Sequence, residues 1–160
     1  MMTLPQAIGL VVDRVDLSRQ QMTEVMRQIM EGQATDAQIG GFLMAMRMKG
    51  ETVDEVTAAV TVMRALSTPV HLDLPHLVDT CGTGGDGASL FNVSTAASFI
   101  VAASGAHVAK HGNRSASSNS GSADVLEAAG VPLTLTPDEV KHSVETVGLG
   151  FMFAKSHHSA

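Results

Sequence analysis

Apolar side chains recur at helical spacing through residues 1–68. Three sequence pairs typical of helix N-termini precede these runs: Ser18 with Gln21, Thr35 with Gln38, and Thr52 with Glu55. In such a capping box, the two side chains bond to backbone N–H groups that a helix start leaves without partners. The pattern therefore predicts that residues 1–68 form a domain made only of helices.

Methionine and glycine give the predicted helices two distinctive features. Methionines at helical spacing, such as Met22, Met26 and Met30, form ordinary core or a subunit interface more often than a specialised binding surface. The pair Gly40-Gly41 lowers the helix propensity of its segment, so we expect another helix to pack closely there. We therefore expect this domain to mediate dimerisation.

The pattern changes after residue 68. Residues 69–76 hold two prolines and show no periodicity, which indicates a linker. Strand-like and helix-like runs then alternate: strand 77–81, helix 95–104 capped by Ser94, strand 106–109, helix 122–129 capped by Ser122, strand 133–135, a helix from Pro137 that Gly148 ends, and strand 150–154. This alternation predicts an α/β domain with a parallel sheet and right-handed crossovers.

The last residues indicate that this α/β domain is incomplete. The chain stops at Ala160, shortly after a predicted strand, where an α/β domain would normally continue into a loop and a helix. We expect residues 77–160 to form the N-terminal portion of a larger domain.

Composition excludes several functional classes. The net charge of −6 and a pI near 5.5 argue against a general nucleic-acid or anionic-membrane binder. The single cysteine excludes an intrachain disulfide. The apolar run 4–12 has no basic region before it and charged residues directly after it, unlike a signal peptide, and no apolar run is long enough to span a membrane. We expect a cytoplasmic protein.

Candidate chemistry is concentrated in two segments rich in glycine, serine and asparagine, residues 81–87 and 111–122. From Gly87 to Ala123 the only formal charges are those of Lys110 and Arg114. Backbone N–H groups, hydroxyls and cations together suit a phosphate-bearing ligand. Because Lys110 to Arg114 follow the second predicted strand, we expect their cations at the carboxyl edge of the sheet, where open α/β folds bind ligands.

Two familiar phosphate-binding motifs do not fit. Residues 82–87 match G-x-G-x-x-G, but the next helix starts only near Thr95 and no acidic residue follows at the required distance, which excludes a dinucleotide fold. No G-K-S/T sequence follows either, which excludes a P-loop. Two alternatives stay open: Asn92 and Ser94 either bind phosphate or merely cap a helix, and Asp86 either holds a sugar hydroxyl or metal-bound water or braces its own loop.

Four segments closely resemble anthranilate phosphoribosyltransferases: DTCGTGGDG, FNVSTAASF, VAKHGNRS and SGSADVLEAAG. The resemblance covers essentially the whole chain. It implies a helical bundle followed by a mainly parallel-sheet phosphoribosyltransferase domain of the nucleoside phosphorylase and glycosyltransferase type. It also implies a homodimeric enzyme of tryptophan biosynthesis. Such an enzyme transfers the phosphoribosyl group of PRPP to the amino group of anthranilate, giving N-(5-phosphoribosyl)anthranilate and pyrophosphate, with Mg²⁺ as cofactor.

The resemblance implies roles for individual residues. Lys110 would stabilise the departing pyrophosphate electrostatically, and Ser94 would also contact Mg²⁺. Gly82, Asn113 and His158 would border the anthranilate site. The implied PRPP-binding set comprises Gly82, Gly85, Asp86, Asn92, Val93, Ser94, Thr95, Lys110, His111, Gly112, Asn113, Arg114, Ser115, Ala116, Ser117, Ser118 and Ser122.

The chain also departs from the family pattern, at Leu90, Asn119 and Lys155. The family's arginine for the anthranilate carboxylate and its acidic pair for Mg²⁺ would lie beyond Ala160, so we expect about half of a site here.

Two rival interpretations remain: a pyrimidine nucleoside phosphorylase-like enzyme, and a non-catalytic nucleic-acid-binding relative on the same fold. Segments 92–95 and 110–113 favour the transferase over the first, and the net charge argues against the second. The expected partners are therefore PRPP and anthranilate, with no nucleic acid and no membrane.

Overall fold

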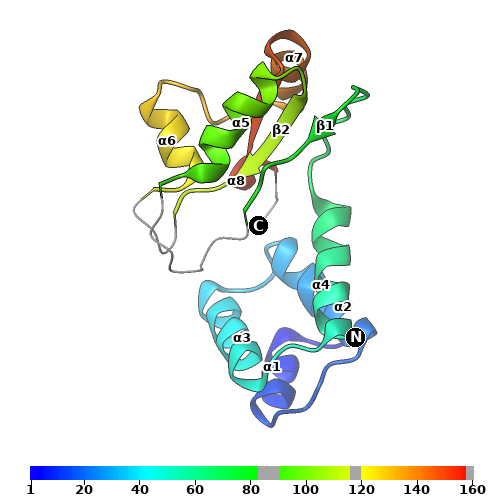
Figure 1. Cartoon of the computed structure of the whole chain (residues 1–160). Coiled ribbons are helices and arrows are strands. Elements are labelled where there is room, and N and C mark those ends of the chain that lie inside the picture. The colour runs from blue at the N-terminus through cyan, green and yellow to red at the C-terminus, as the bar shows by residue number, and fades with distance from the viewer. Residues whose placement is uncertain (83–90, 116–119, 158–160) are drawn as a thin grey trace. The chain divides into compact units, whose positions relative to one another are not determined.

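The structure is a computed structural model that describes residues 1–82, 91–115 and 120–157 (Figure 1). The chain forms two compact units, Met1–Ser67 and Thr68–His157. The first unit is entirely helical and the second combines a sheet with helices, so the predicted fold class is confirmed. Among the described helices, none is both long and apolar enough to cross a membrane.

Each helix of the first unit begins with a capping box. The helices are α1 (Leu4–Val12), α2 (Arg19–Met30), α3 (Asp36–Lys49) and α4 (Val53–Leu66). The predicted boxes at Ser18, Thr35 and Thr52 are confirmed. Thr3 and Gln6 form a fourth box at the start of α1, which the sequence pattern carries as clearly as the other three.

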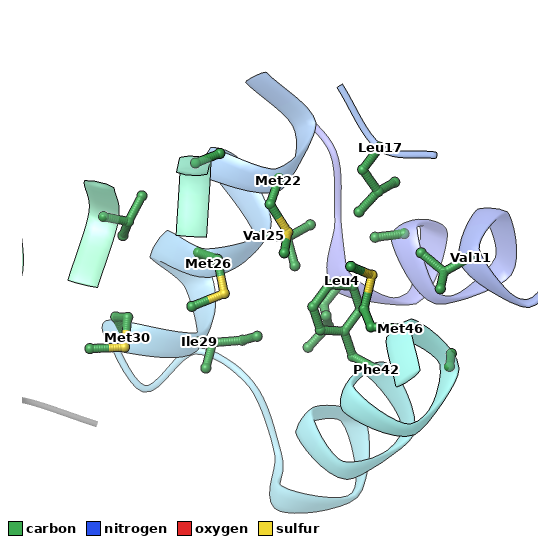
Figure 2. Close-up of a cluster of buried hydrophobic side chains, with 14 residues drawn as sticks. Leu4, Val11, Leu17, Met22, Val25, Met26, Ile29, Met30, Phe42 and Met46 are labelled. Carbon is green, nitrogen blue, oxygen red and sulfur yellow. The ribbon is translucent and has the colours of Figure 1, made fainter. Parts of the chain in front are cut away.

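The core of the helical unit is built largely from flexible apolar side chains. Met22, Met26 and Met30 of α2 are buried in one cluster with Phe42 and Met46 of α3 (Figure 2). Helix α2 packs on α4, and α1 packs on α3. The prediction that the methionines form ordinary core is confirmed for these residues.

The expected close packing at Gly40-Gly41 is absent from the described residues. Both glycines lie away from the core, and a Cβ added at either would meet no heavy atom within 4 Å. The reason is that α3 turns its other face, with Phe42 and Met46, toward the core. Among the described residues, nothing therefore packs on the face at the two glycines.

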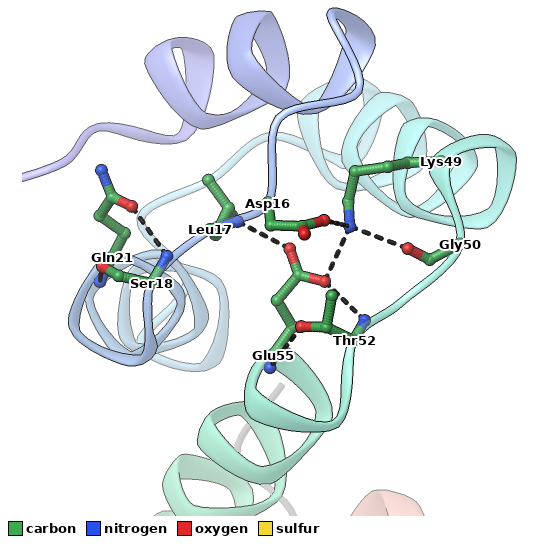
Figure 3. Close-up of polar contacts among 8 residues, drawn as sticks. All are labelled: Asp16, Leu17, Ser18, Gln21, Lys49, Gly50, Thr52 and Glu55. Atoms are coloured by element: carbon green, nitrogen blue, oxygen red, sulfur yellow. Dashed lines mark hydrogen bonds and ion pairs between the residues drawn. The ribbon is translucent and has the colours of Figure 1, made fainter.

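A buried ion pair joins Lys49, the last residue of α3, to Glu55 in the first turn of α4 (Figure 3). Both side chains also contact the segment before α2. The Lys49 ammonium lies 2.9 Å from Glu55 Oε2 and 2.7 Å from Asp16 Oδ1. Glu55 also accepts hydrogen bonds from the backbone N–H groups of Leu17 and Thr52, both at 2.8 Å. Burial acts to raise the pKa of the Glu55 carboxyl, but these donors outweigh it and hold that pKa below its ordinary value.

The second unit is built on a parallel sheet whose described strands lie in the order β1-β2-β3. Its elements are β1 (Leu77–Val78), α5 (Val93–Ala103), β2 (His107–Gly112), α6 (Ser122–Ala128), α7 (Pro137–Val147), β3 (Leu149–Phe153) and α8 (Ala154–His157). Both strand pairings are parallel, which confirms the predicted sheet type.

Helices α5 and α7 lie on opposite faces of this sheet. The Lys110 ammonium on β2 bonds to Ser94 of α5 at 3.2 Å. Its neighbour Ala109 packs instead in an apolar cluster with Val140 and Val144 of α7. Because neighbouring strand residues point to opposite faces, β2 is covered on both sides.

Three predicted strands have different bounds in the structure, and β3 differs least, running from Leu149 to Phe153 instead of from residue 150 to residue 154. β1 ends at Val78 instead of residue 81, and it is exposed rather than buried, because it pairs only with β2 and the helices pack on β2 and β3. β2 runs past residue 109 to Gly112, because its pairing with β3 continues to Phe153.

Two apolar segments belong to loops that fill the core. The predicted strand 133–135 is wrong: Leu133 and Leu135 pack into apolar clusters from the connection between α6 and α7. Within 69–76, Leu72 and Leu74 likewise pack on the cluster around Val140. Burial, not ladder pairing, explains the apolar pattern of both segments.

Candidate phosphate site

Asp79 connects the segment after β1 to the carboxyl end of β2. Its Oδ1 accepts hydrogen bonds from the Cys81 N–H at 2.9 Å and from the His111 N–H at 3.1 Å. The two glycine-rich segments therefore begin side by side at the carboxyl edge of the sheet, as their strand order predicts.

Asn92 forms the N-cap of α5, a role that the sequence pattern assigned to Ser94. Asn92 Oδ1 accepts hydrogen bonds from the Thr95 N–H at 3.0 Å and from the Ser94 hydroxyl at 3.1 Å. Asn92 takes this role because its carbonyl oxygen lies three residues before the N–H it caps. Ser94 thus sits in the first turn of α5, with its hydroxyl also facing Lys110.

Lys110 is a buried cation within β2, not in the loop after it as predicted, because it pairs with Phe151 of β3. Its Nζ lies 3.2 Å from the Ser94 hydroxyl and 3.4 Å from the Thr80 carbonyl oxygen. Both partners are neutral, and no carboxylate in the described part of the chain forms an ion pair with it. Burial lowers the pKa of the Lys110 ammonium. This buried positive charge, which Asp79 favours through space without an ion pair among the described residues, suits an anionic ligand.

Two hydroxyl residues that the sequence analysis did not identify support this arrangement. Thr80 donates to the Ser94 carbonyl at 3.2 Å and lies 3.4 Å from the Ser98 hydroxyl. Ser98 donates to the same carbonyl at 2.9 Å and is buried. The spacing of Ser94 and Ser98, one helical turn apart in a helix whose other residues except Thr95 are apolar, is the sequence signal that identifies a polar strip facing β2.

The second glycine-rich segment leaves β2 through a crowded position. A Cβ at Gly112 would lie 2.9 Å from the Phe151 ring and 3.0 Å from Ser122 Cβ, so this position excludes larger residues. Ser122 is the first residue of α6, whose N-cap is Gly121 rather than Ser122 as predicted. Gly121 has no side chain that could cap α6, and Asp124, in the first turn, accepts a hydrogen bond from the Gly121 N–H at 2.8 Å.

Thr95 differs from the other residues at the start of α5. It is buried, and its hydroxyl has no hydrogen-bond partner among the described residues. It lines a largely apolar cavity of about 190 Å³ together with Ser98, Lys110 and Phe151. Val93, by contrast, is exposed.

Of the remaining predicted site residues, His111 and Ser115 are half-buried, and the others are exposed or lie outside the described ranges. Gly82 is exposed, directly after Cys81, and Asn113 and Arg114 are exposed after β2. Lys155, one of the departures from the family pattern, is exposed on α8. The predicted residues that lie outside the described ranges are Gly85, Asp86, Ala116, Ser117, Ser118 and His158, together with the departures Leu90 and Asn119.

The described residues offer Mg²⁺ few ligands of their own. Within the described ranges, no group of three or more His, Cys, Asp or Glu side chains lies close enough to hold a metal. Ser94 supplies a hydroxyl beside Lys110. Mg²⁺ in phosphate-transfer sites commonly takes one or two protein ligands and completes its shell with substrate phosphates and waters. The residues present therefore fit a cation that is held mainly by a phosphate ligand.

Comparison with known proteins identifies close relatives of this chain. The anthranilate phosphoribosyltransferase of Stutzerimonas stutzeri is 63% identical over 159 residues, which are 99% of this chain and 46% of the relative. The enzyme of the same name from Teredinibacter turnerae is 64% identical over 99% of this chain and 47% of its own length. The chain thus spans about half the length of the curated relatives it matches.

Solved structures give the same fold. The crystal structure of anthranilate phosphoribosyltransferase from Thermus thermophilus matches with a TM-score of 0.81 and 41% identity, covering 95% of this chain and 46% of that one. The Saccharomyces cerevisiae enzyme in complex with PRPP and Mg also has a TM-score of 0.81, at 24% identity over 97% of this chain and 47% of that one.

Family models match both units of the structure. Residues 5–67 match the model of the glycosyl transferase family helical bundle domain, and residues 74–160 match that of the glycosyl transferase family a/b domain. The chain therefore belongs to this glycosyl transferase family.

Proposed function

We propose that the protein carrying this chain transfers the phosphoribosyl group of PRPP to the amino group of anthranilate, the step of tryptophan biosynthesis that releases pyrophosphate. One observation carries the proposal: the buried Lys110 ammonium, without a carboxylate partner among the described residues, meets the Ser94 hydroxyl where two glycine-rich segments begin. The names of the relatives at 63% and 64% identity support it. They favour it over a nucleoside phosphorylase or a nucleic-acid-binding protein.

The chemistry requires stabilisation of a leaving group. As the bond between the ribose carbon and pyrophosphate breaks, negative charge grows on the pyrophosphate oxygens. A fixed cation at that place lowers the barrier because it interacts more strongly with the transition state than with the ground state. Lys110 is the catalytic residue in this role, and its burial keeps water from screening its charge.

The other residues bind and orient the substrates. Gly82, Gly85, Asp86, residues 92–95, residues 110–118 and Ser122 form the PRPP site in this proposal. Gly82 and Asn113, both exposed at the same edge of the sheet, border anthranilate with His158. No protein nucleophile is needed, because alignment lets the anthranilate amine attack the ribose carbon directly.

Mg²⁺ belongs to this proposal as a cofactor that arrives with PRPP. The Ser94 hydroxyl would be its ligand in the described part of the chain, and the cation would supply positive charge that neutralises the pyrophosphate. In this proposal the Ser94 oxygen interacts with two positive charges, Mg²⁺ and the Lys110 ammonium, from which it accepts a hydrogen bond at 3.2 Å.

The proposed assembly is a homodimer formed through α3 and α4. Their outer faces expose large apolar side chains, and Gly40-Gly41 leaves space beside them. The exposed residues are Leu43, Met44 and Met48 on α3 with Val56, Val60 and Met63 on α4. Covering this surface removes apolar area from water, which favours association. Light scattering should give twice the protomer mass, and a monomer would refute the dimer.

The direct test of the activity follows the loss of anthranilate fluorescence in the presence of PRPP and Mg²⁺, with protein expressed from the complete gene. The proposal requires a loss that depends on PRPP. A protein shown to be folded by circular dichroism that leaves the fluorescence unchanged would refute the transferase and point to another phosphorylated ligand.

A further inference from the structure

The second glycine-rich segment is closed by one carboxylate. Asp124, in the first turn of α6, accepts hydrogen bonds through Oδ2 from the Ser115 N–H at 3.0 Å and the Gly121 N–H at 2.8 Å. These two N–H groups lie near the beginning and the end of the segment. A single side chain therefore holds the two ends of the segment together.

Arg114 holds that carboxylate in place. Its Nη1 lies 3.0 Å from Asp124 Oδ1 and 2.7 Å from Glu127 Oε2, and its Nη2 lies 2.7 Å from Glu127 Oε1. The guanidinium thus forms a bidentate ion pair with Glu127, in which two parallel hydrogen bonds give this kind of pair its strongest geometry. It also stands over the Phe153 ring, 5.9 Å from the centroid, at the end of β3.

The charges in this cluster argue against Arg114 as a phosphate ligand. One guanidinium faces two carboxylates, so the three side chains together carry a net negative charge. The backbone donors Ser115 and Gly121, together with Arg114, hold the pKa of Asp124 below its ordinary value. Both carboxylates therefore stay ionised at neutral pH, and the cluster offers a polyanion such as PRPP no net attraction.

The backbone around the cluster is as tightly fixed as the side chains. A Cβ at Gly121 would lie 2.4 Å from the Ser115 nitrogen and 2.5 Å from the Asn113 carbonyl oxygen. The ends of the segment thus pass each other at a distance that only glycine permits. Asn113, next to Arg114, is one of the residues that border anthranilate in the proposed function.

We propose that Arg114, Asp124 and Glu127 are positioning residues that hold the described ends of the second glycine-rich segment, residues 111–115 and 120–122, in place for PRPP, and that Arg114 is not itself a phosphate ligand. This inference rests on the proposed function. It assigns a role to two acidic residues that the sequence analysis left without one. It also changes the role of Arg114, from a residue that binds PRPP to one that holds PRPP-binding residues in place.

Whether the KM for PRPP rises or falls when Asp124 or Glu127 loses its charge tests the inference. Glu127→Gln and Asp124→Asn each remove a negative charge near the proposed polyanion site, so electrostatics alone would lower the KM for PRPP. If the two acids position the segment, the KM for PRPP rises instead, by about 3-fold to 10-fold, with a smaller change in kcat. Glu145→Gln is the matched control, because it removes the same charge from an exposed pair with Lys141 on α7. It should leave the KM within about twofold of the unchanged protein.

A second measurement does not depend on activity. Amide hydrogen exchange at Ser115 and Gly121, the donors to Asp124, should be faster in Asp124→Asn than in Glu145→Gln, at equal melting temperature. A KM for PRPP that stays constant or falls in both acid variants, with unchanged exchange, would overturn the inference. Failure of the proposed function is distinguishable, because it appears as an inactive unsubstituted protein before any variant is compared.

Discussion

The Lys110 ammonium on β2 lies 3.2 Å from the Ser94 hydroxyl in the first turn of α5. This contact brings together the start of α5 and the side chain of Lys110, which lie 16 residues apart in the chain. The helix start contributes hydroxyl and backbone dipoles, and the strand contributes a full positive charge. In the proposed function both features act on the diphosphate, because the helix start carries only partial charge and the ammonium is a single compact charge.

Replacing Lys110 tests the charge of this site. In Lys110→Met the apolar stem stays and the ammonium is lost, so we expect kcat/KM for PRPP to fall by about 100-fold or more, the usual cost of one electrostatic donor. Stability should be unchanged or higher, because the folded chain no longer buries an uncompensated charge. Lys141→Met on α7 is the control and should keep full activity. Equal kcat/KM values in the two variants would remove Lys110 from the mechanism.

The pH dependence of the site follows from the lowered pKa of Lys110. As pH rises, the folded protein loses this proton before an ordinary lysine would, so kcat/KM for PRPP should fall at a pH below about 10.5. Between the folded and the ordinary pKa the unfolded chain binds more protons, so this group makes the free energy of unfolding rise with pH. Both effects should disappear in Lys110→Met. A pH profile shared by both proteins would contradict the assignment.

The capping boxes and the parallel sheet could be predicted because their signals are local. Thr35 and Gln38, for example, lie within one helical turn, and alternation of strands and helices leaves few topologies. The position of Lys110 inside β2 could not be predicted, because strand length depends on how far β3 continues the pairing. Thr80 became visible only in three dimensions, since its hydroxyl meets Ser98 across 18 residues, whereas the spacing of Ser94 and Ser98 is already a signal in the sequence.

Segment 133–135 shows the limit of apolar patterning. Leu133 is buried as deeply as many strand residues, yet the segment is a loop. Periodicity reports burial, and a short buried segment has the same pattern whether or not a neighbouring strand pairs with it. Leu77 shows the opposite case, a residue that pairs in a strand without being buried. It lies in β1 and pairs with His107 of β2, yet it is 38% exposed.

Two glycines should respond in opposite ways to alanine. At Gly121 a Cβ would clash with backbone atoms of Asn113 and Ser115, so Gly121→Ala should destabilise the α/β unit by about 1–3 kcal/mol and raise the KM for PRPP. At Gly9, inside α1, a Cβ meets nothing within 4 Å, so Gly9→Ala should stabilise the helical unit by about 0.5–1 kcal/mol. Urea unfolding of both variants measures the difference. Equal free energies of unfolding would show that Gly121 has room to shift.

The ion pair of Lys49 and Glu55 is the contact in the helical unit whose loss should matter most. Glu55 is fully buried and Lys49 is 3% exposed in its side chain. Lys49→Met would leave a buried carboxylate with backbone donors but no cation, so we expect the free energy of unfolding to fall by about 3 kcal/mol. Because the pKa of Glu55 is lowered, its contribution in the unchanged protein is present above an ordinary pKa of 4.5 and is lost as pH falls through the folded value.

Arg19→Met provides the matched control for this last prediction. Arg19 and Asp54 also form an ion pair, at 2.7 Å, but their side chains are 63% and 62% exposed. Water screens such a pair, so its loss should cost less than about 1 kcal/mol. Chemical unfolding at pH 7 should therefore separate the two variants, and unfolding near pH 3 should bring the Lys49→Met variant closer to the unchanged protein, because Glu55 then needs no cation. Equal losses at pH 7 would mean that the backbone donors and water stabilise the Glu55 carboxylate without Lys49, and that burial makes this pair no stronger than an exposed one.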